Sequence, residues 1–109
     1  MTYYVYILYS KTSDIYYVGQ TYDVDKRFEQ HNDPLGSSYT SKHQPWILVK
    51  KIEVGKSRGD AMKIEKFIKK QKSRTFIDRV VQDPLQFDFI AQINFLGINL
   101  KIKHKYLID

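Results

Sequence analysis

The sequence contains no cysteine, which excludes a disulfide framework and thiolate metal sites. No apolar run approaches the length needed to cross a membrane, and the chain has no internal repeat and no long low-complexity tract. The N-terminus, Met1-Thr2-Tyr3, lacks the basic and then apolar layout of a signal peptide. We therefore expect a soluble cytoplasmic protein with no membrane partner.

The length of 109 residues and the hydrophobic content of 42% predict one domain with a small core. We place this domain at residues 1–83, because the residue before Pro84 is biased away from helix. Residues 84–109 are assigned to a C-terminal extension. From Ile98 to Tyr106 apolar and polar residues alternate, as in a strand. That segment is interpreted as an added edge strand, a dimer element or a tail without fixed structure, and the oligomeric state is not indicated.

Composition and spacing predict three strands and three helices in the first 83 residues. Tyrosine, leucine and β-branched residues at 3–9 and 15–20 indicate two strands joined by a polar turn, and 46–54 reads as a third strand. Helices are predicted at about 23–33, from 57 or 60 to about 70, and at 74–82. The expected helix caps are Thr21 or Asp23, Ser57 or Asp60, and Ser73.

Basic residues are concentrated in one part of the chain. The net charge is +6, yet the stretch from Lys50 to Arg74 holds ten basic and three acidic residues, a balance of +7. The remainder is therefore slightly acidic. A local basic surface indicates a polyanionic partner. The alternative interpretation is a well-solvated, lysine-rich helix face.

The helix predicted at 23–33 has two polar residues on its apolar side. Val24 and Phe28 define an apolar stripe, and Arg27 and His31 share it at three and seven residues after Val24. A charged side chain on an inward face needs a partner. Arg27 therefore predicts either an anion site or an ion pair with a carboxylate. His31 alone indicates a catalytic role or a satisfied core histidine equally well.

The basic helix also carries one misplaced charge. Glu65 follows Ala61 by four residues and precedes Ile68 by three, so it projects from the edge of the apolar face. One carboxylate with waters and substrate phosphate is a usual way to hold magnesium. The alternative is a salt bridge from Glu65 to Arg27 or to a lysine. The outer side of this helix is assigned to four lysines: Lys63, Lys66, Lys69 and Lys70.

Nine tyrosines are present, and six of them fall in the first two predicted strands. For most of them strand propensity and core packing suffice as an explanation. Tyr6 and Tyr17 are singled out only if Arg27 and Glu65 lie beside them. Gly19, at the end of the second strand, is expected to let another group approach the backbone closely.

Several of these features occur in an order that resembles the GIY-YIG nuclease family, and the resemblance covers about Tyr3 to Ile68. Any one motif is weak evidence, whereas the ordered set is specific. The motifs are Tyr4-Val5-Tyr6, Tyr17-Val18-Gly19, Thr21, Arg27, His31-Asn32, Tyr39-Thr40, Pro45 and Glu65. The chain is similar to small stand-alone bacterial members, which are related to the N-terminal incision domain of the bacterial excision-repair nuclease.

This resemblance implies an α/β (α+β) fold with a three-stranded antiparallel sheet flanked by helices. It implies a metal-dependent endonuclease that hydrolyses phosphodiester bonds in DNA, in repair or recombination. RNA is the alternative substrate that the resemblance leaves open. Tyr6, Tyr17, Arg27 and His31 would be catalytic, and Glu65 would bind one Mg²⁺ or Mn²⁺ ion. Arg27 would hold the phosphate, a tyrosine hydroxyl would activate water, and His31 would relay a proton near neutral pH.

Two positions depart from the family pattern. Tyr4 stands where the family name has glycine, and Gln20 follows Gly19 where several family nucleases have lysine. Glutamine supplies neither charge nor a base, so the lysine role is absent or passes to another residue such as Lys42. The residues assigned to nucleic-acid binding are Gly19, Gln20, Lys42, Lys63, Lys66, Lys69 and Lys70.

Two other functions remain open at this point. The first is a non-catalytic nucleic-acid-binding module with the same fold, which Gln20 and the small size favour. The second is a protein-interaction domain that uses the segment from Ile98 to Tyr106.

Overall fold

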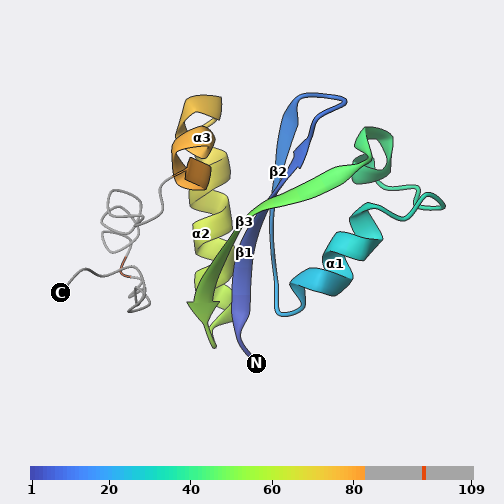
Figure 1. The fold of residues 1–109 in the computed structure, drawn as a ribbon. Coiled ribbons are helices and arrows are strands. Elements are labelled where there is room, and N and C mark those ends of the chain that lie inside the picture. The colour runs from blue at the N-terminus through green and yellow to red at the C-terminus, as the bar shows by residue number, and fades with distance from the viewer. Residues whose placement is uncertain (83–96, 98–109) are drawn as a thin grey trace.

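The computed structural model describes residues 1–82 and Gly97, and it contains three strands, three α-helices and one 3₁₀ helix in the described part of the chain (Figure 1). The elements in chain order are β1 (Tyr3–Ser10), β2 (Ile15–Thr21), α1 (Val24–His31), the 3₁₀ helix η1 (Tyr39–His43), β3 (Trp46–Gly55), α2 (Arg58–Lys70) and α3 (Arg74–Gln82). Every predicted strand and helix of the first 83 residues is confirmed within one or two residues. No element was predicted at η1, and the strand predicted from Ile98 to Tyr106 lies outside the described residues.

The three strands form one antiparallel sheet in the order β2-β1-β3. β1 is therefore the central strand and pairs with both neighbours, with Tyr6 opposite Gly19 on β2 and opposite Lys51 on β3. The predicted fold, a three-stranded antiparallel sheet flanked by helices, is confirmed.

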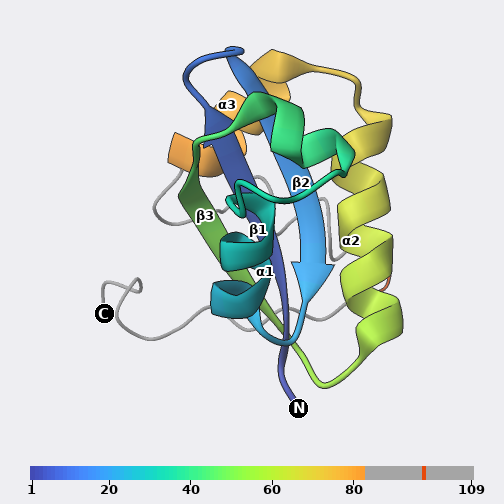
Figure 2. The same cartoon turned by 90° about the vertical axis from the view of Figure 1, so that its right-hand side faces the viewer.

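The sheet separates two packed layers, because alternate residues of β1 point to opposite faces. α2 and α3 cover one face, and α1 and η1 lie in front of the other (Figure 2). The first layer buries Val5, Ile7, Val18, Ile52, Ala61, Ile64, Ile68 and Val80. The second layer buries Tyr6, Leu8, Val24 and Trp46. Figure 2 also shows α2 running beside β2, one of the two edge strands.

The predicted caps account for where the helices begin. The Asp23 carboxylate accepts a hydrogen bond from the Lys26 amide at 3.1 Å, and the Ser57 hydroxyl accepts one from the Asp60 amide at 3.1 Å. Ser73 accepts from the Phe76 amide at 3.1 Å at the start of α3. Each of these side chains satisfies an amide that has no partner within its helix.

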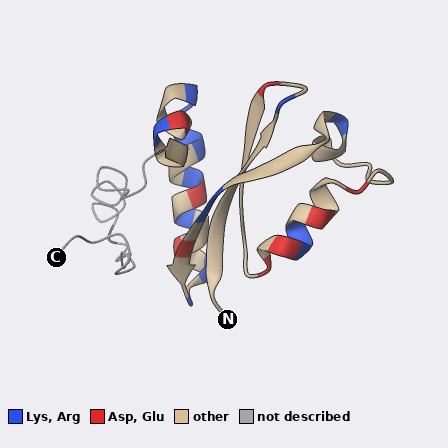
Figure 3. Ribbon diagram, viewed as in Figure 1, with Lys and Arg blue, Asp and Glu red and all other residues tan. Residues whose placement is uncertain are grey.

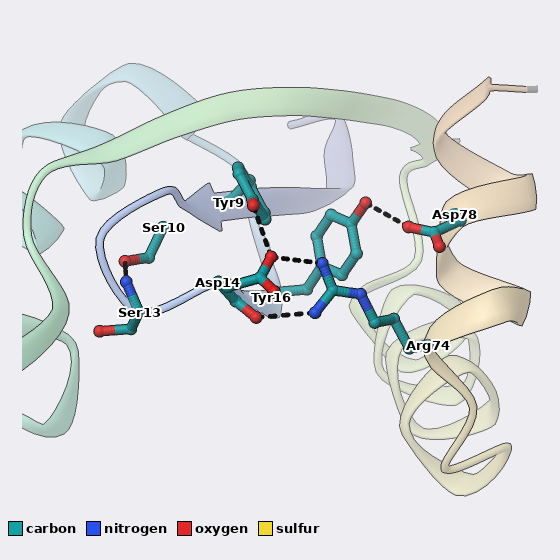
Figure 4. A network of polar contacts seen from close by, with 7 residues as sticks. All are labelled: Tyr9, Ser10, Ser13, Asp14, Tyr16, Arg74 and Asp78. Carbon is teal, nitrogen blue, oxygen red and sulfur yellow. Dashed lines mark hydrogen bonds and ion pairs between the residues drawn. The ribbon is translucent and has the colours of Figure 1, made fainter.

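A polar network joins the β1–β2 turn to α3 (Figure 4). The Arg74 guanidinium pairs with the Asp14 carboxylate, and Tyr9 donates to the same carboxylate at 2.6 Å. Tyr16 donates to Asp78 at 2.5 Å, and burial together with this bond raises the pKa of Tyr16 to about 12. These contacts attach α3 to the sheet. The domain boundary at residue 83 stays a prediction.

The charges are distributed unevenly over the two layers (Figure 3). Lysine and arginine line α2, whereas aspartate and glutamate dominate the outer side of α1 and its ends. No helix within residues 1–82 has the length and apolar content of a membrane span.

Candidate active site

The Tyr6 phenol is the centre of the layer between the sheet and α1. Tyr6 is fully buried, and its ring lies over Gly19 on β2. A Cβ atom at position 19 would lie 2.5 Å from the Tyr6 oxygen and 2.6 Å from its Cζ. The group that approaches Gly19 is therefore a side chain of this chain. The assignment of Gly19 to nucleic-acid binding stays a prediction, but close approach no longer supports it.

His31 and Tyr17 contact the Tyr6 phenol from two sides. His31 ends α1 with only 5% of its surface exposed, and its Nε2 atom lies 2.8 Å from the Tyr6 hydroxyl. The Tyr17 ring on β2 lies 4.7 Å from the His31 ring and 6.3 Å from the Tyr6 ring, measured between centroids. Tyr17 is only partly buried, so it forms the more accessible part of this aromatic cluster.

Thr40 holds the far side of His31, and sequence reasoning gave it no role. Its hydroxyl lies 3.0 Å from His31 Nδ1 and 3.0 Å from the Ser38 hydroxyl, and Thr40 is buried. Trp46 Nε1 donates to the Thr40 carbonyl at 2.8 Å, which positions the η1 backbone. The only signal in the sequence was the Tyr39-Thr40 motif, whose function depends on a contact between distant segments.

Arg27 supplies positive charge to the same cluster. Hydrogen bonding with the Tyr6 hydroxyl, opposed in part by burial, raises the pKa of Arg27, and Tyr17 adds to this effect. One guanidinium Nη atom donates to the Gln30 side chain at 3.4 Å, whereas the buried Nε has no partner within the described residues. Arg27 is therefore a charged group whose Nε donor is unused within the described residues.

These contacts assign the proton positions. A guanidinium is only a donor, so from the Arg27 charge beside Tyr6 we infer that the Tyr6 oxygen accepts from Arg27 and that the Tyr6 proton is directed to His31 Nε2. The neutral imidazole then carries its proton on Nδ1 and donates to Thr40. The result is a chain of hydrogen bonds from Tyr6 through His31 to Thr40, with the Arg27 charge at its Tyr6 end.

Burial changes the acid–base behaviour of both central groups. Desolvation, followed by the Arg27 charge, lowers the pKa of His31 to about 4. Desolvation also raises the pKa of Tyr6, although Arg27 opposes it. A pKa of about 4 leaves the imidazole neutral at neutral pH, where it accepts a hydrogen bond from Tyr6. The predicted proton relay through His31 stays a prediction. Tyr6 stays a phenol at neutral pH.

Glu65 and Lys69 are α2 residues that lie near this site, at the β2 edge of the sheet. Desolvation is the main cause of the raised pKa of Tyr6, and the Glu65 carboxylate adds the smallest of the contributions. Lys69 Nζ lies 5.8 Å from the centre of the Tyr17 ring and 3.6 Å from the Glu65 carboxylate. The alternative of a salt bridge between Glu65 and a lysine is thus observed. Lys69 differs from the outer lysines with which it was grouped, because it faces Tyr17.

The remaining predicted binding residues lie away from the tyrosines. Lys63, Lys66 and Lys70 are exposed on α2, and Lys42 is exposed on η1. By alternation along β2, Gln20 points to the face opposite Gly19, toward α2. Its Oε1 atom is buried and has no hydrogen-bond partner among the described residues. Gln20 therefore supplies no lysine-like group next to Tyr17, and the role of Lys42 stays a prediction.

Comparison with known proteins identifies the family of the chain. The model of the GIY-YIG catalytic domain matches residues 2–77. The chain belongs to the GIY-YIG family. The family is a nuclease family that acts on nucleic acids and generally uses divalent metal ions.

A solved structure with a similar sequence is the solution NMR structure of the UPF0213 protein BH0048 from Bacillus halodurans. It is 36% identical, the match covers 74% of this chain and 83% of that one, and the TM-score is 0.46. The comparison with curated proteins gave no match. In this GIY-YIG domain the two motif tyrosines, Tyr6 and Tyr17, are the rings that lie side by side over His31.

Proposed function

We propose that this GIY-YIG domain is a metal-dependent endonuclease that hydrolyses phosphodiester bonds in DNA. The observation that supports this most directly is that the Arg27 guanidinium acts on both motif tyrosines, Tyr6 and Tyr17, while its buried Nε lacks a partner within the described residues. A nuclease site needs an anion holder, a water activator and stabilisation of developing charge. The cluster of Tyr6, Tyr17, Arg27, His31 and Glu65 offers groups for each of these needs.

Arg27 binds the scissile phosphate in this proposal. Its pKa is raised, so the guanidinium stays charged throughout the working pH range. A guanidinium donates two parallel hydrogen bonds to phosphate oxygens, and these bonds strengthen as charge develops on the oxygens. Arg27 is only partly buried, so part of its side chain faces solvent, from which a phosphate would approach.

Tyr17 orients or deprotonates the attacking water. It is the more exposed of the two motif tyrosines, and Arg27 and Lys69 both lie beside it. Tyr6 has the supporting role, because its proton is committed to His31 and its pKa is raised. A buried phenol that is held in this way fixes the positions of Arg27 and Gly19 rather than exchanging protons with water.

Glu65 is the residue that would hold a divalent ion. About a quarter of its side chain is exposed, and one oxygen is engaged by Lys69 at 3.6 Å, so the carboxylate keeps room for a hard cation. Within residues 1–82 no three histidine or acidic side chains gather as a metal cage, which favours an ion held by one carboxylate, waters and phosphate. When bound, Mg²⁺ or Mn²⁺ would neutralise negative charge on the phosphate and the leaving oxygen.

The exposed lysines of α2 guide the DNA backbone to this site. Lys63, Lys66 and Lys70 extend the positive charge of Lys69 along one helix, and α1 on the other side carries mainly acidic residues (Figure 3). Contacts of lysine with phosphate carry no sequence information and weaken with salt. We therefore infer weakly sequence-selective binding along α2. Roles in repair or recombination, and a cytoplasmic location, stay predictions.

The test is nicking of supercoiled plasmid by purified full-length chain with Mg²⁺, with Mn²⁺ and with a chelator. The proposal expects nicking with either ion, none with the chelator, and none above background for Glu65→Gln. Glu29→Gln is the matched control, because Glu29 is an exposed carboxylate of α1. If the parent binds DNA but never nicks it, or if Glu65→Gln cuts as well as the parent, the non-catalytic binding module replaces the nuclease. The glutamine at position 20 favours that second function.

A further inference from the structure

A chain of aromatic rings leads from the candidate active site to the protein surface. The Tyr17 ring lies 6.1 Å from the Trp46 ring, Trp46 lies 6.2 Å from His43, and His43 lies 4.9 Å from Tyr39. Trp46 is buried, whereas Tyr39 has 61% of its surface exposed. The outermost ring therefore lies in water beside the site without filling any core.

Hydrogen bonds hold the η1 helix that carries Tyr39. His43 Nδ1 lies 2.8 Å from the Ser13 hydroxyl, and Trp46 donates to the Thr40 carbonyl at 2.8 Å. Thr40, next to Tyr39 in the sequence, is buried against His31 of the site. The exposed ring is thus presented by a fixed backbone, which lowers the entropic cost of placing a ligand on it.

A positive charge accompanies the exposed ring. Lys42 is exposed on the same 3₁₀ helix, three residues after Tyr39. An exposed aromatic face next to a cation is the combination with which proteins bind single-stranded nucleic acid, since the ring stacks on a base and the cation contacts the backbone. A base-paired duplex offers no free base face for such stacking.

We propose that Tyr39 and Lys42 form a subsite for an unpaired nucleotide of a DNA strand that enters the candidate active site. This inference rests on the proposed function for the nature of the ligand, and it adds a preference for DNA with an unpaired segment beside the scissile phosphate. Tyr39 stacks on the base, and Lys42 contacts a neighbouring phosphate. The subsite lies next to the site because Thr40 joins η1 to His31.

Equilibrium binding to two DNA probes tests the proposal. The full chain is titrated by fluorescence anisotropy against single-stranded (dT)15 and against a 15-base-pair duplex, with a chelator present so that no cleavage is needed. Stacking on one aromatic side chain corresponds to roughly 5- to 150-fold in affinity. Tyr39→Ala should weaken binding of (dT)15 within that range and leave the duplex within twofold. Tyr39→Phe should bind like the parent, because stacking needs the ring and not the hydroxyl.

Tyr22→Ala is the matched control. Tyr22 is also an exposed tyrosine, at 52%, but its ring packs on Tyr3 and an acidic residue, Asp23, follows it. This variant should keep the affinity of the parent for both probes. A direct readout is quenching of 2-aminopurine placed in the single strand, which should occur with the parent and with Tyr39→Phe and be lost with Tyr39→Ala.

The outcomes separate this inference from the proposed function. If the parent nicks plasmid while Tyr39→Ala binds (dT)15 as tightly as the parent, the subsite is contradicted and the nuclease stands. If Tyr39→Ala and Tyr22→Ala lose the same affinity, the effect is not specific to η1 and the subsite is again contradicted. If no variant nicks but the Tyr39 effect is present, the subsite belongs to a binding module.

Discussion

The ring of Tyr6 occupies the space that the missing side chain of Gly19 leaves on the neighbouring strand. The two residues are register partners, and an added Cβ atom would lie 2.5 Å from the Tyr6 oxygen. The glycine of the second motif and the tyrosine of the first are therefore two halves of one packing arrangement. That arrangement sets where the Tyr6 hydroxyl meets His31 and Arg27.

Gly19→Ala should destabilise the domain and displace the Tyr6 hydroxyl. A fully buried ring on the central strand has no free space into which to move, and overpacking of this kind costs about 1–3 kcal/mol. The free energy of unfolding in urea measures the effect. Gly59→Ala is the control, because its Cβ would meet only Ser57 Oγ at 3.7 Å on exposed helix α2. Equal stability of the two variants would contradict the packing argument.

Tyr17→Phe should lower the cleavage rate more than Tyr6→Phe. Tyr17 is partly exposed beside Arg27, whereas the Tyr6 hydroxyl is engaged with His31 at 2.8 Å and its pKa is raised. Loss of a proton-transfer group costs about 10²- to 10⁴-fold. We expect about 10²-fold or more for Tyr17→Phe and less than tenfold for Tyr6→Phe under single-turnover conditions. The reverse order would assign water activation to Tyr6.

Lys69→Met should lower the metal concentration that half-maximal activity needs. Lys69 Nζ lies 3.6 Å from the Glu65 carboxylate and competes with a cation for it. A half-exposed helix pair of this kind is worth about 0.3–0.5 kcal/mol, so the midpoint of a Mg²⁺ titration should fall by roughly twofold. Lys66→Met removes the same charge from an exposed position of α2 and should leave the midpoint unchanged. A higher midpoint for Lys69→Met would show that Lys69 and the metal do not share Glu65.

The buried His31 should make stability depend on pH in the acidic range. Its pKa is about 4 in the folded chain, against about 6.5 for an unperturbed histidine. Between these values the unfolded chain binds a proton that the folded chain does not, so the free energy of unfolding falls as the pH drops from 6.5 to 4. The slope is at most about 1.4 kcal/mol per pH unit for one proton.

Urea unfolding of the parent at several pH values between 4 and 7.5 measures this slope. His31→Gln should show a shallower dependence than the parent, because the buried titrating group is gone. His43→Gln keeps His31 and serves as the control for a histidine of η1. Identical slopes in the parent and His31→Gln would contradict the low pKa of His31.

The sequence was sufficient to predict the three strands and three α-helices of the described residues, although not η1. The alternation along β1 and the helix caps depend only on neighbouring residues. The structure has alternate β1 residues in opposite layers and caps at Asp23, Ser57 and Ser73, as predicted. The helical spacing of Arg27 and His31 also placed both residues on the inner side of α1. Local pattern was therefore enough for these strands and helices and for identifying the unusual polar residues, whereas the arrangement of the sheet came from the family resemblance.

Contacts between segments that are distant in the chain could not be predicted from the sequence pattern. The partner of His31 on its far side, Thr40, comes from η1, a short 3₁₀ helix with no apolar periodicity to reveal it. The reason for Gly19 lies on another strand, at Tyr6. Lys69 was assigned to the solvent side, because spacing along a helix does not show that α2 borders the edge of the sheet at Tyr17.

The most direct test of the proposed nuclease site is the single-turnover cleavage rate of Arg27→Ala, measured on a labelled DNA substrate with Mg²⁺. We predict a rate at least about 10²-fold below that of the parent, because Arg27 holds the phosphate as charge develops. The fold should be retained, and Lys26→Ala, which changes an exposed neighbour on α1, should cut like the parent. Cleavage by Arg27→Ala at the rate of the parent, or no cleavage by the parent with either Mg²⁺ or Mn²⁺, would contradict the proposal.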